Sequence, residues 1–126
     1  MRGYEQRNGK SPPIFYSVEC GSRCGHEAAG MEKVNLGEKL ALFADHWSLK
    51  VMGELNGQHV KLVKFVGEFV WHKHDHEDEL FLVVKGRFRM EFRDRQVSLE
   101  EGEFLIVPRE VEHRSVADDE AHVMLF

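Results

Sequence analysis

The chain is organised around a stretch in which a cluster of histidines runs into a series of acids: Trp71-His72-Lys73-His74-Asp75-His76-Glu77-Asp78-Glu79. Three of the eight histidines of the chain lie within five of these residues. Neutral imidazoles and an ionised carboxylate are ligands that suit Mn, Fe, Co, Ni, Cu or Zn. The stretch therefore predicts a centre for one divalent transition metal ion, whose identity the sequence leaves open.

Strand geometry selects which of these residues can share an ion. Residues 69–74 are expected to form one strand and residues 79–84 the next. Side chains at positions i and i+2 of a strand point to the same face, so His72 and His74 can reach one ion. If the two strands pair as an antiparallel hairpin, Glu79 lies opposite these histidines. His76 falls in the intervening turn and is expected to be exposed, together with the neighbouring acids at 75, 77 and 78.

Later in the chain, His113 is the candidate for a fourth ligand, because it follows Pro108 in a second extended stretch. Spacing alone does not bring it to the ion. Two further histidines, His59 and His122, also fall on predicted strands. Each is expected to be a partly buried residue, with a place in the pocket as the alternative.

Outside the histidine cluster, apolar and polar residues alternate in short runs that predict strands. Asn56-Gly57 separates the runs 50–55 and 58–66, and this dipeptide is the strongest short signal for a β-hairpin. Gly67 is expected to mark a bend or bulge. The other predicted strands are 87–93, 97–99, 104–107, 111–116 and 121–126, with a turn at Asp118-Asp119 between the last two. Many short strands at this spacing indicate an all-β sandwich or barrel.

One helix is expected before the strands begin. Leu36, Leu40, Phe43 and Trp47 recur at helical spacing, and Asn35 stands where an N-cap is needed. This pattern predicts a helix of about three turns over residues 36–47.

Composition limits the protein class. The chain has 126 residues, enough for one domain, and 42% of them are hydrophobic, enough for one core. A net charge of −5 argues against a partner that is nucleic acid or an anionic membrane. No apolar run approaches the roughly 20 residues of a transmembrane helix. The expected location is the cytoplasm.

The first thirty residues differ in texture from the rest. They are rich in glycine, contain Pro12-Pro13 and show no sustained apolar period. Residues 1–30 are therefore predicted to be a flexible extension or a non-native leader, and residues 31–126 the folded domain. Cys20, Cys24 and His26 are too few for a zinc-finger site, which favours two free thiols and leaves their role open.

Two ordered motifs resemble those of the cupin family. The first family motif is Gly, about five residues, His-x-His, three or four residues, Glu, six residues and Gly. Here it reads Gly67-x4-His72-x-His74-x4-Glu79-x6-Gly86, with the first gap one residue short.

The second family motif is Gly, five residues, Pro-x-Gly, two residues, His, three residues and Asn. Here it reads Gly102-x5-Pro108-x-Glu110-x2-His113-x3-Ala117, so that glutamate and alanine replace the family's glycine and asparagine. These departures affect a turn and its hydrogen bonds, but they leave the ligand types in place.

The resemblance covers roughly residues 51–126 and extends to the short single-domain bacterial cupins. It implies a double-stranded β-helix, or jelly-roll barrel, preceded by one short helix. It also implies a metal centre made by His72, His74, Glu79 and His113. The alternative is a metal-free member of this fold, as in some sugar epimerases, with ordinary strand histidines at these positions.

Function is less constrained than fold. The resemblance implies a metal-dependent enzyme of dioxygenase or isomerase type, acting on a small polar molecule inside the barrel. The alternative is a non-catalytic module that binds or senses a small molecule or a sugar. No second acid–base group is identifiable beside the ligands, because Glu112 and Trp71 have the wrong strand parity, so no catalytic residue is assigned.

A homodimer is also expected. The outward residues of the predicted strand 79–84 are Leu80, Leu82 and Val84, all apolar, and a second sheet, the helix or another subunit must cover them. Cupins are often dimers, which favours the other subunit.

Overall fold

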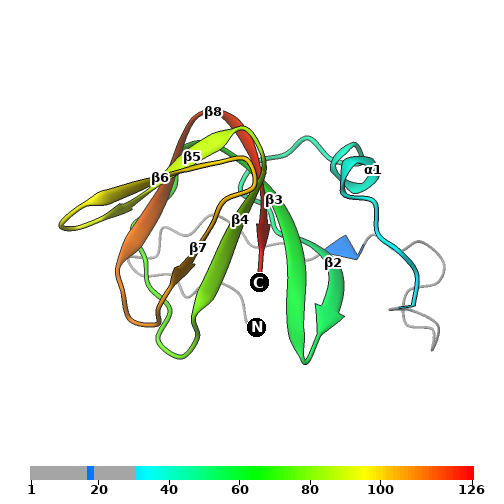
Figure 1. Ribbon diagram of the computed structural model, residues 1–126, viewed down its shortest axis with the longest axis horizontal. Coiled ribbons are helices and arrows are strands. Elements are labelled where there is room, and N and C mark those ends of the chain that lie inside the picture. Colours follow the sequence, from blue (N-terminus) through cyan, green and yellow to red (C-terminus); the bar gives the residue numbers. More distant parts are fainter. Residues whose placement is uncertain (1–16, 19–30) are drawn as a thin grey trace.

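A single bent β-sheet closes around an apolar interior (Figure 1). The computed structural model describes residues 17–18 and 31–126. Its elements are β1 (Ser17–Val18), α1 (Leu36–Leu40), β2 (Lys50–Leu55), β3 (Gln58–Glu68), β4 (Glu79–Lys85), β5 (Arg87–Phe92), β6 (Gln96–Glu100), β7 (Phe104–Val107) and β8 (His113–Leu125). The predicted all-β architecture with one short helix is confirmed. Within the described ranges, no helix is long and apolar enough to cross a membrane.

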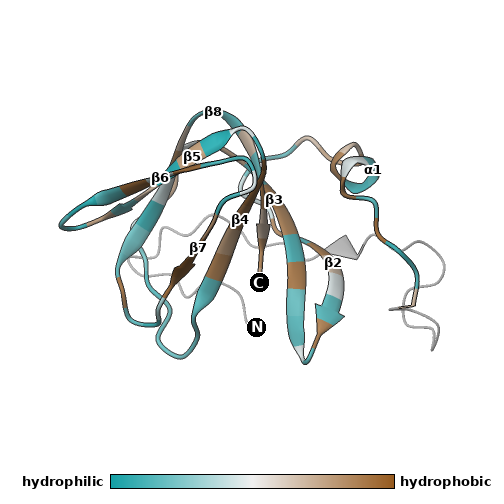
Figure 2. Ribbon diagram, viewed as in Figure 1, coloured by the Kyte–Doolittle hydropathy of each residue, from teal (hydrophilic) through white to brown (hydrophobic). Residues whose placement is uncertain are grey.

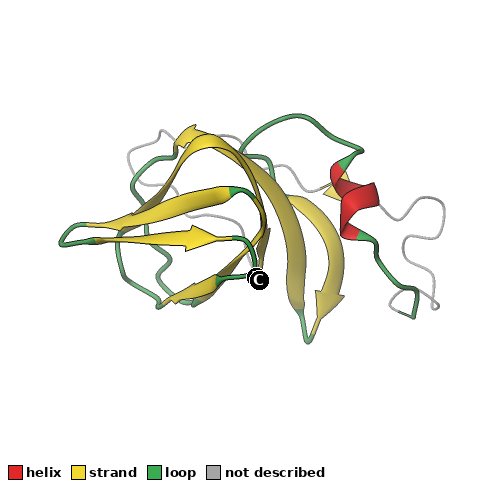
Figure 3. Ribbon diagram, turned by 45° about the horizontal axis from the view of Figure 1, so that its top comes forward, coloured by secondary structure: helices red, strands yellow, loops and turns green. Residues whose placement is uncertain are grey.

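The C-terminal strand β8 joins the two sides of the barrel. Residues 113–116 pair with β5, residues 116–117 and 121–125 pair with β3, and residues 122–125 also pair with β4. β7 extends the sheet beyond β4, and β6 extends it beyond β5. The strands therefore wrap around one interior, with α1 outside the sheet at the end opposite the β5–β6 hairpin (Figure 3).

Interior side chains follow the period of two that the sequence shows. On β4 and in the last five residues of β8, alternate residues are almost fully buried, whereas residues 61–65 of β3 are all buried because neighbouring segments cover both faces of that strand. The core cluster consists of Leu49, Val63, Phe65, Phe81, Val83, Phe88, Met90, Leu99, Val107, Ala117, Ala121, Val123 and Leu125. Burial of this apolar surface is the main favourable term in folding.

Two of the predicted turn features are present. Asn56 and Gly57 have φ values of 52° and 79° and connect β2 to β3, as the Asn-Gly signal predicts. At Gly67 the register between β3 and β8 shifts, so the predicted bulge is also confirmed. Opposite this bulge, residues 118–120 add extra length to β8.

The expected turn at Asp118-Asp119 is wrong. Residues 113–125 form one strand, and the two acids lie in its irregular, exposed middle. A true turn would reverse the chain. Here both halves of β8 continue to pair with β3, so the acids mark a bulge.

The prediction of a strand at residues 69–74 is also wrong, because these residues do not form a regular strand. Only His72 forms a bridge there, with His113, and Phe69 N–H donates to the carbonyl of Ser115. The segment thus takes its hydrogen bonds from the start of β8. The predicted hairpin with residues 79–84 does not form, because β4 pairs with β7 and β8 instead.

The helix is shorter than its apolar spacing suggests. Asn35 is the N-cap, and its Oδ1 accepts a hydrogen bond from Glu38 N–H at 2.9 Å, but the helix ends at Leu40. Trp47, expected on the helix face, has a φ of 59° and stacks on Phe65 at a ring-centroid distance of 4.5 Å. Its backbone and indole N–H groups both donate to carbonyls of β3. These tertiary contacts outweigh the local helical period.

An apolar surface remains on the outer side of β4 and β7. Leu80 pairs with Ile106 and Leu82 with Phe104, and Figure 2 shows hydrophobic residues along both strands. Phe104 is 60% exposed and Ile106 is 51% exposed. The homodimer expected from the sequence would cover this surface and stays a prediction.

The proposed division at residue 30 also stays a prediction. Within the first thirty residues, Ser17–Val18 pairs in parallel with Lys50 and Val51 of β2. The remainder, including Cys20, Cys24 and His26, lies outside the described residues.

The turn between β4 and β5 provides a test of this packing. Gly86 has a φ of +85°, and a Cβ there would lie 3.0 Å from the carbonyl oxygen of Glu120 in β8. Gly102 has nearly the same φ, +83°, but a Cβ there would meet nothing within 4 Å. Gly102→Ala should cost about 1 kcal/mol through left-handed strain. Gly86→Ala should cost about 1–3 kcal/mol more, because β8 must shift.

Urea unfolding of the two variants measures this difference. Equal destabilisation by both substitutions would show that the contact with β8 carries no cost.

Candidate metal centre

His72 and His113 are held together by their own backbones. The N–H of His72 donates to the carbonyl of His113 at 3.0 Å, and the N–H of His113 donates to that of His72 at 2.9 Å. This reciprocal pair is the isolated antiparallel bridge at the start of β8. The two imidazoles consequently lie side by side, with ring centroids 4.4 Å apart.

His74 and the acidic loop after it are tied to the segment before β8. The N–H of Glu110 donates to the carbonyl of His74, and the N–H of Arg109 donates to Oδ1 of Asp78 at 2.9 Å. Glu110 has a φ of 68°, the left-handed conformation that the glycine of the family motif adopts readily. The turn is thus kept despite the replacement. Asp78, expected to be merely solvated, anchors the loop.

Glu79 is the first residue of β4 and points into the barrel. It alternates with Phe81 and Val83, both almost fully buried, and is itself 2% exposed. An apolar wall therefore lies beside the carboxylate. Nε2 of His74 lies 2.9 Å from Oε1 of Glu79. Although the predicted hairpin is absent, the carboxylate still meets the histidines.

The fold brings all four predicted ligands together. One donor atom from each of His72, His74, Glu79 and His113 lies within 4.8 Å of all the others. Two donors that bind the same ion at about 2.1 Å can be no more than about 4.2 Å apart, so the set is close to binding size. In the part of the chain that the structure describes, neither Glu79 oxygen nor Nε2 of His113 has a well-oriented hydrogen bond. Buried polar atoms are rarely left in this way unless a ligand uses them.

Backbone carbonyls orient two of the imidazoles. Nδ1 of His72 lies 2.9 Å from the carbonyl of Val70, and Nδ1 of His113 lies 2.8 Å from that of Val111. Each Nδ1 must carry the hydrogen and donate it, which leaves the lone pair on Nε2 facing the other ligands. Metal-binding histidines are usually fixed by such a bond on the second nitrogen.

The electrostatics favour the ligand-competent protonation states. Burial, followed by repulsion from His113, lowers the pKa of His72 from 6.5 to about 4. Burial also lowers the pKa of His113. For Glu79, burial alone would raise the pKa, but His74, Lys61 and His113 together outweigh it and the pKa is lowered. Neutral imidazoles and an ionised carboxylate are what a metal ion requires.

Lys61 is a charged interior residue that the strand analysis missed. It lies on the same face of β3 as Val63 and Phe65 and is 1% exposed. Burial lowers the pKa of its amine, and attraction to Glu79 and Glu77 partly opposes this shift. Lys61 alternates with Val63 and Phe65 along the strand, and this spacing could have predicted that it points inward. A lysine at an inward position is rare, however, so the spacing alone is weak evidence.

Other candidate residues lie outside the ligand group. His76 is exposed, and His122 contacts Glu120 at 3.1 Å. Glu112 faces outward and accepts a hydrogen bond from Arg93 at 2.9 Å, as its parity predicts. Trp71 lies beneath the guanidinium of Arg93, 3.8 Å from its ring centroid, also outside the ligand group.

Comparison with known proteins identifies the family of the chain. The family model for the cupin domain matches residues 61–126, which include every member of the ligand group. The chain belongs to the cupin family.

Relatives cover the same region. The uncharacterised protein YdbB of Bacillus subtilis (strain 168) is 35% identical over 65 residues, which are 51% of this chain and 58% of that protein. A cupin-2 domain containing protein of Shewanella frigidimarina NCIMB 400 is 42% identical, with a TM-score of 0.72 over 73% of this chain and 90% of that one. Protein NMB1881 of Neisseria meningitidis is 29% identical, with a TM-score of 0.69 over 75% of this chain and 96% of that one.

The buried histidine predicts how the metal-free protein responds to acid. In the unfolded chain His72 takes up its proton near pH 6.5, whereas in the folded protein it does so only near pH 4. Between these values the unfolded state binds more protons, so the free energy of unfolding falls as the pH falls. The difference corresponds to roughly 3 kcal/mol for this one group.

Urea unfolding of chelator-treated protein at pH 7, 6, 5 and 4 measures the effect. His72→Gln should flatten the pH dependence, whereas His76→Gln, at an exposed position, should leave it unchanged. If the wild type and His72→Gln lost the same stability on acidification, the source would be another group.

Proposed function

We propose that His72, His74, Glu79 and His113 bind one divalent transition metal ion, and that the protein acts on a small polar molecule at that centre. The observation that carries the proposal is the convergence of four buried donors within 4.8 Å, three from residues 72–79 and the fourth, His113, from a distant part of the sequence. The carbonyls of Val70 and Val111 support it by fixing the tautomers of two ligands.

The residues fit such an ion chemically. Three neutral imidazoles and one carboxylate leave a divalent ion with a net positive charge. When bound, the ion supplies Lewis-acid chemistry, or oxygen chemistry if it is Fe, Ni or Cu. Phe69 and Phe81 lie edge-on to His72 and His113, at centroid distances of 5.2 and 6.1 Å, and keep water from that side. The side chain of His74 is 11% exposed and marks the side from which a small molecule approaches.

Lys61 adds a second charge inside the barrel. Without an ion, its ammonium adds to the larger effect of His74 in lowering the pKa of the buried Glu79 carboxyl. With an ion, the metal itself stabilises the carboxylate and Lys61 lies beside a positive centre. The amine can then orient an anionic group of a substrate or donate a proton to it, which is the acid–base function that sequence inspection did not find.

An enzyme of dioxygenase or isomerase type is the function that these groups support best, because the candidate metal ligands and a titratable amine are buried in the same interior. The alternative is a module that binds or senses a small molecule without turnover. Oxygen consumption by the iron-loaded protein would favour the dioxygenase. A zinc protein that converts no aldose, ketose or sugar phosphate would favour the binding module.

Metal content tests the proposed ligand set. Purified protein should contain about one transition metal ion per chain by elemental mass spectrometry. His72→Ala and His113→Ala should lose it, because each removes a donor that no neighbour can replace. His122→Ala is the matched control, since that histidine lies on the same strand as His113 but outside the group.

Circular dichroism would show that the variants remain folded. A wild-type protein with no metal above background, after growth in supplemented medium, would defeat the proposal. Retention of metal by folded His72→Ala and His113→Ala would place the ion elsewhere.

Lys61→Met tests the charge balance. Methionine keeps the apolar stem and removes the ammonium, so the metal-free protein should lose about 3 kcal/mol of stability because Glu79 loses a buried partner. The metal-loaded protein should lose much less. The rise in Tm on adding Zn²⁺ should therefore be larger in the variant than in the wild type.

Lys85→Met, at an exposed position on β4, controls for the loss of one positive charge. If Lys61→Met lost the same stability with and without metal, the amine and the metal ion would not be alternative partners of the Glu79 carboxylate.

A further inference from the structure

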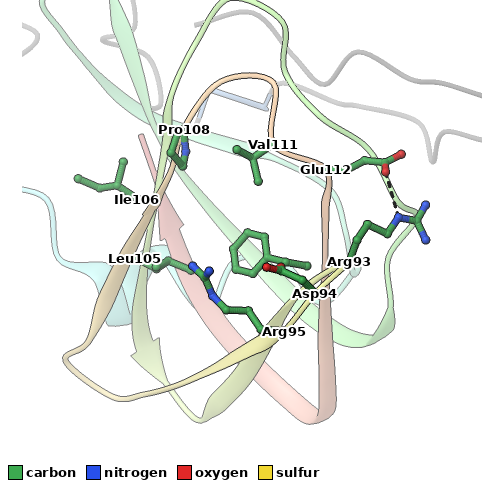
Figure 4. A pocket seen from close by; sticks show the side chains of 9 residues that line it. Arg93, Asp94, Arg95, Leu105, Ile106, Pro108, Val111 and Glu112 are labelled. Atoms are coloured by element: carbon green, nitrogen blue, oxygen red, sulfur yellow. Dashed lines mark hydrogen bonds and ion pairs between the residues drawn. The ribbon is translucent and has the colours of Figure 1, made fainter.

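A pocket of about 370 Å³ opens where β7, the β5–β6 turn and the segment before β8 meet (Figure 4). Its apolar floor is formed by Phe92, Leu105 and Val111, which are partly buried against the core. None of the four metal-ligand candidates lines it. The pocket is thus a separate feature with a composition of its own.

Each floor residue is linked to the metal centre. Phe92 pairs with His113 across β5 and β8, so both side chains lie on the same face of the sheet. Leu105 pairs with Phe81, whose ring is 6.1 Å from that of His113. Val111 provides the carbonyl that orients the His113 imidazole. A molecule resting on this floor therefore lies next to the centre, separated from it by one layer of side chains.

The charged residues at the rim are not equivalent. Arg93 is already engaged, because it donates to Glu112 at 2.9 Å and lies over Trp71. Arg95 lies over the floor itself, with its guanidinium carbon 5.2 Å from the centroid of the Phe92 ring. Within the described residues no carboxylate is within ion-pairing distance of Arg95. The main chain of Arg95 is held at this turn, since Phe92 N–H donates to the carbonyl of Arg95 at 2.7 Å.

We propose that this pocket binds a small organic anion with an apolar body, whose carboxylate is held by Arg95 while its hydrocarbon part rests on Phe92, Leu105 and Val111. The proposal rests on the proposed function in one respect: it names a class of molecule that would bind next to the metal centre. A guanidinium presents paired N–H donors that match a carboxylate, and an exposed arginine over an apolar floor offers both parts of the recognition.

Binding to metal-free protein tests the proposal without the metal, and it prevents the carboxylate from binding an ion directly. Isothermal titration compares benzoate with benzyl alcohol, which lacks the charge, and with acetate, which lacks the apolar body. Benzoate should bind more tightly than either. Arg95→Met should weaken benzoate binding about tenfold or more and leave benzyl alcohol unchanged, because a hydrogen bond to a charged group is lost.

Two variants serve as controls. Arg87→Met removes the same charge from an exposed position of β5 outside the pocket and should not change benzoate binding. Asp94→Asn removes the acid beside Arg95 and should leave benzoate binding equal or tighter, because a like charge disappears.

Several outcomes would overturn the inference. These are no saturable benzoate binding, equal binding of benzoate and benzyl alcohol, or equal effects of Arg95→Met and Arg87→Met. Tighter binding of benzylamine than benzoate would assign the pocket to cations through Asp94. If the protein binds metal but fails these tests, the pocket proposal is wrong and the proposed metal centre stands. If the protein passes these tests but binds no metal, the pocket proposal stands and the proposed metal centre is wrong.

Discussion

The two reciprocal backbone hydrogen bonds between His72 and His113 are the constraint on which the site depends. They join a segment without regular structure to the first residue of β8, and β8 in turn pairs with β3, β4 and β5. The imidazoles are therefore positioned by the same strand that holds the barrel closed. Because backbone positions the ligands, the centre does not depend on the flexible rotamers of long side chains.

Closure of the barrel also excludes water from the interior, and this burial shifts the pKa values of the interior histidines and of Glu79. Burial in a low dielectric disfavours imidazolium and would disfavour carboxylate, yet Glu79 remains ionised because His74, Lys61 and His113 surround it. The outer face of β5 and β8 handles charge differently. There Arg89 and Arg114 both contact Glu91, at distances of 3.0 and 2.8 Å, in a solvent-accessible network. Ion pairs that water can reach contribute little to stability, and only the buried group is placed to bind a metal ion.

The sequence predicts those features of the fold that depend on local patterns, and it fails where contacts between distant segments decide the structure. Phe81 and Val83 alternate with outward residues as expected, and Asn56-Gly57 forms the expected hairpin, because both signals are local. The helix was overestimated at its C-terminal end because Trp47 stacks on Phe65, a contact that no local pattern contains. Asp78 is exposed, as the sequence predicts, but its carboxylate also accepts a hydrogen bond from the backbone N–H of Arg109, a partner in another segment that no local pattern contains.

The sequence by itself determined the all-β class and the two motifs that supply ligand types in the right order, because strand period and turn chemistry are local properties of the chain. Only the tertiary structure decided how those ligands meet. The expected hairpin between the histidines and Glu79 does not exist, and the residues converge because His72 bridges to β8 while Glu79 begins β4. It also brought Lys61 into the site and placed Arg95 over Phe92, since burial and proximity across strands arise only when the barrel closes.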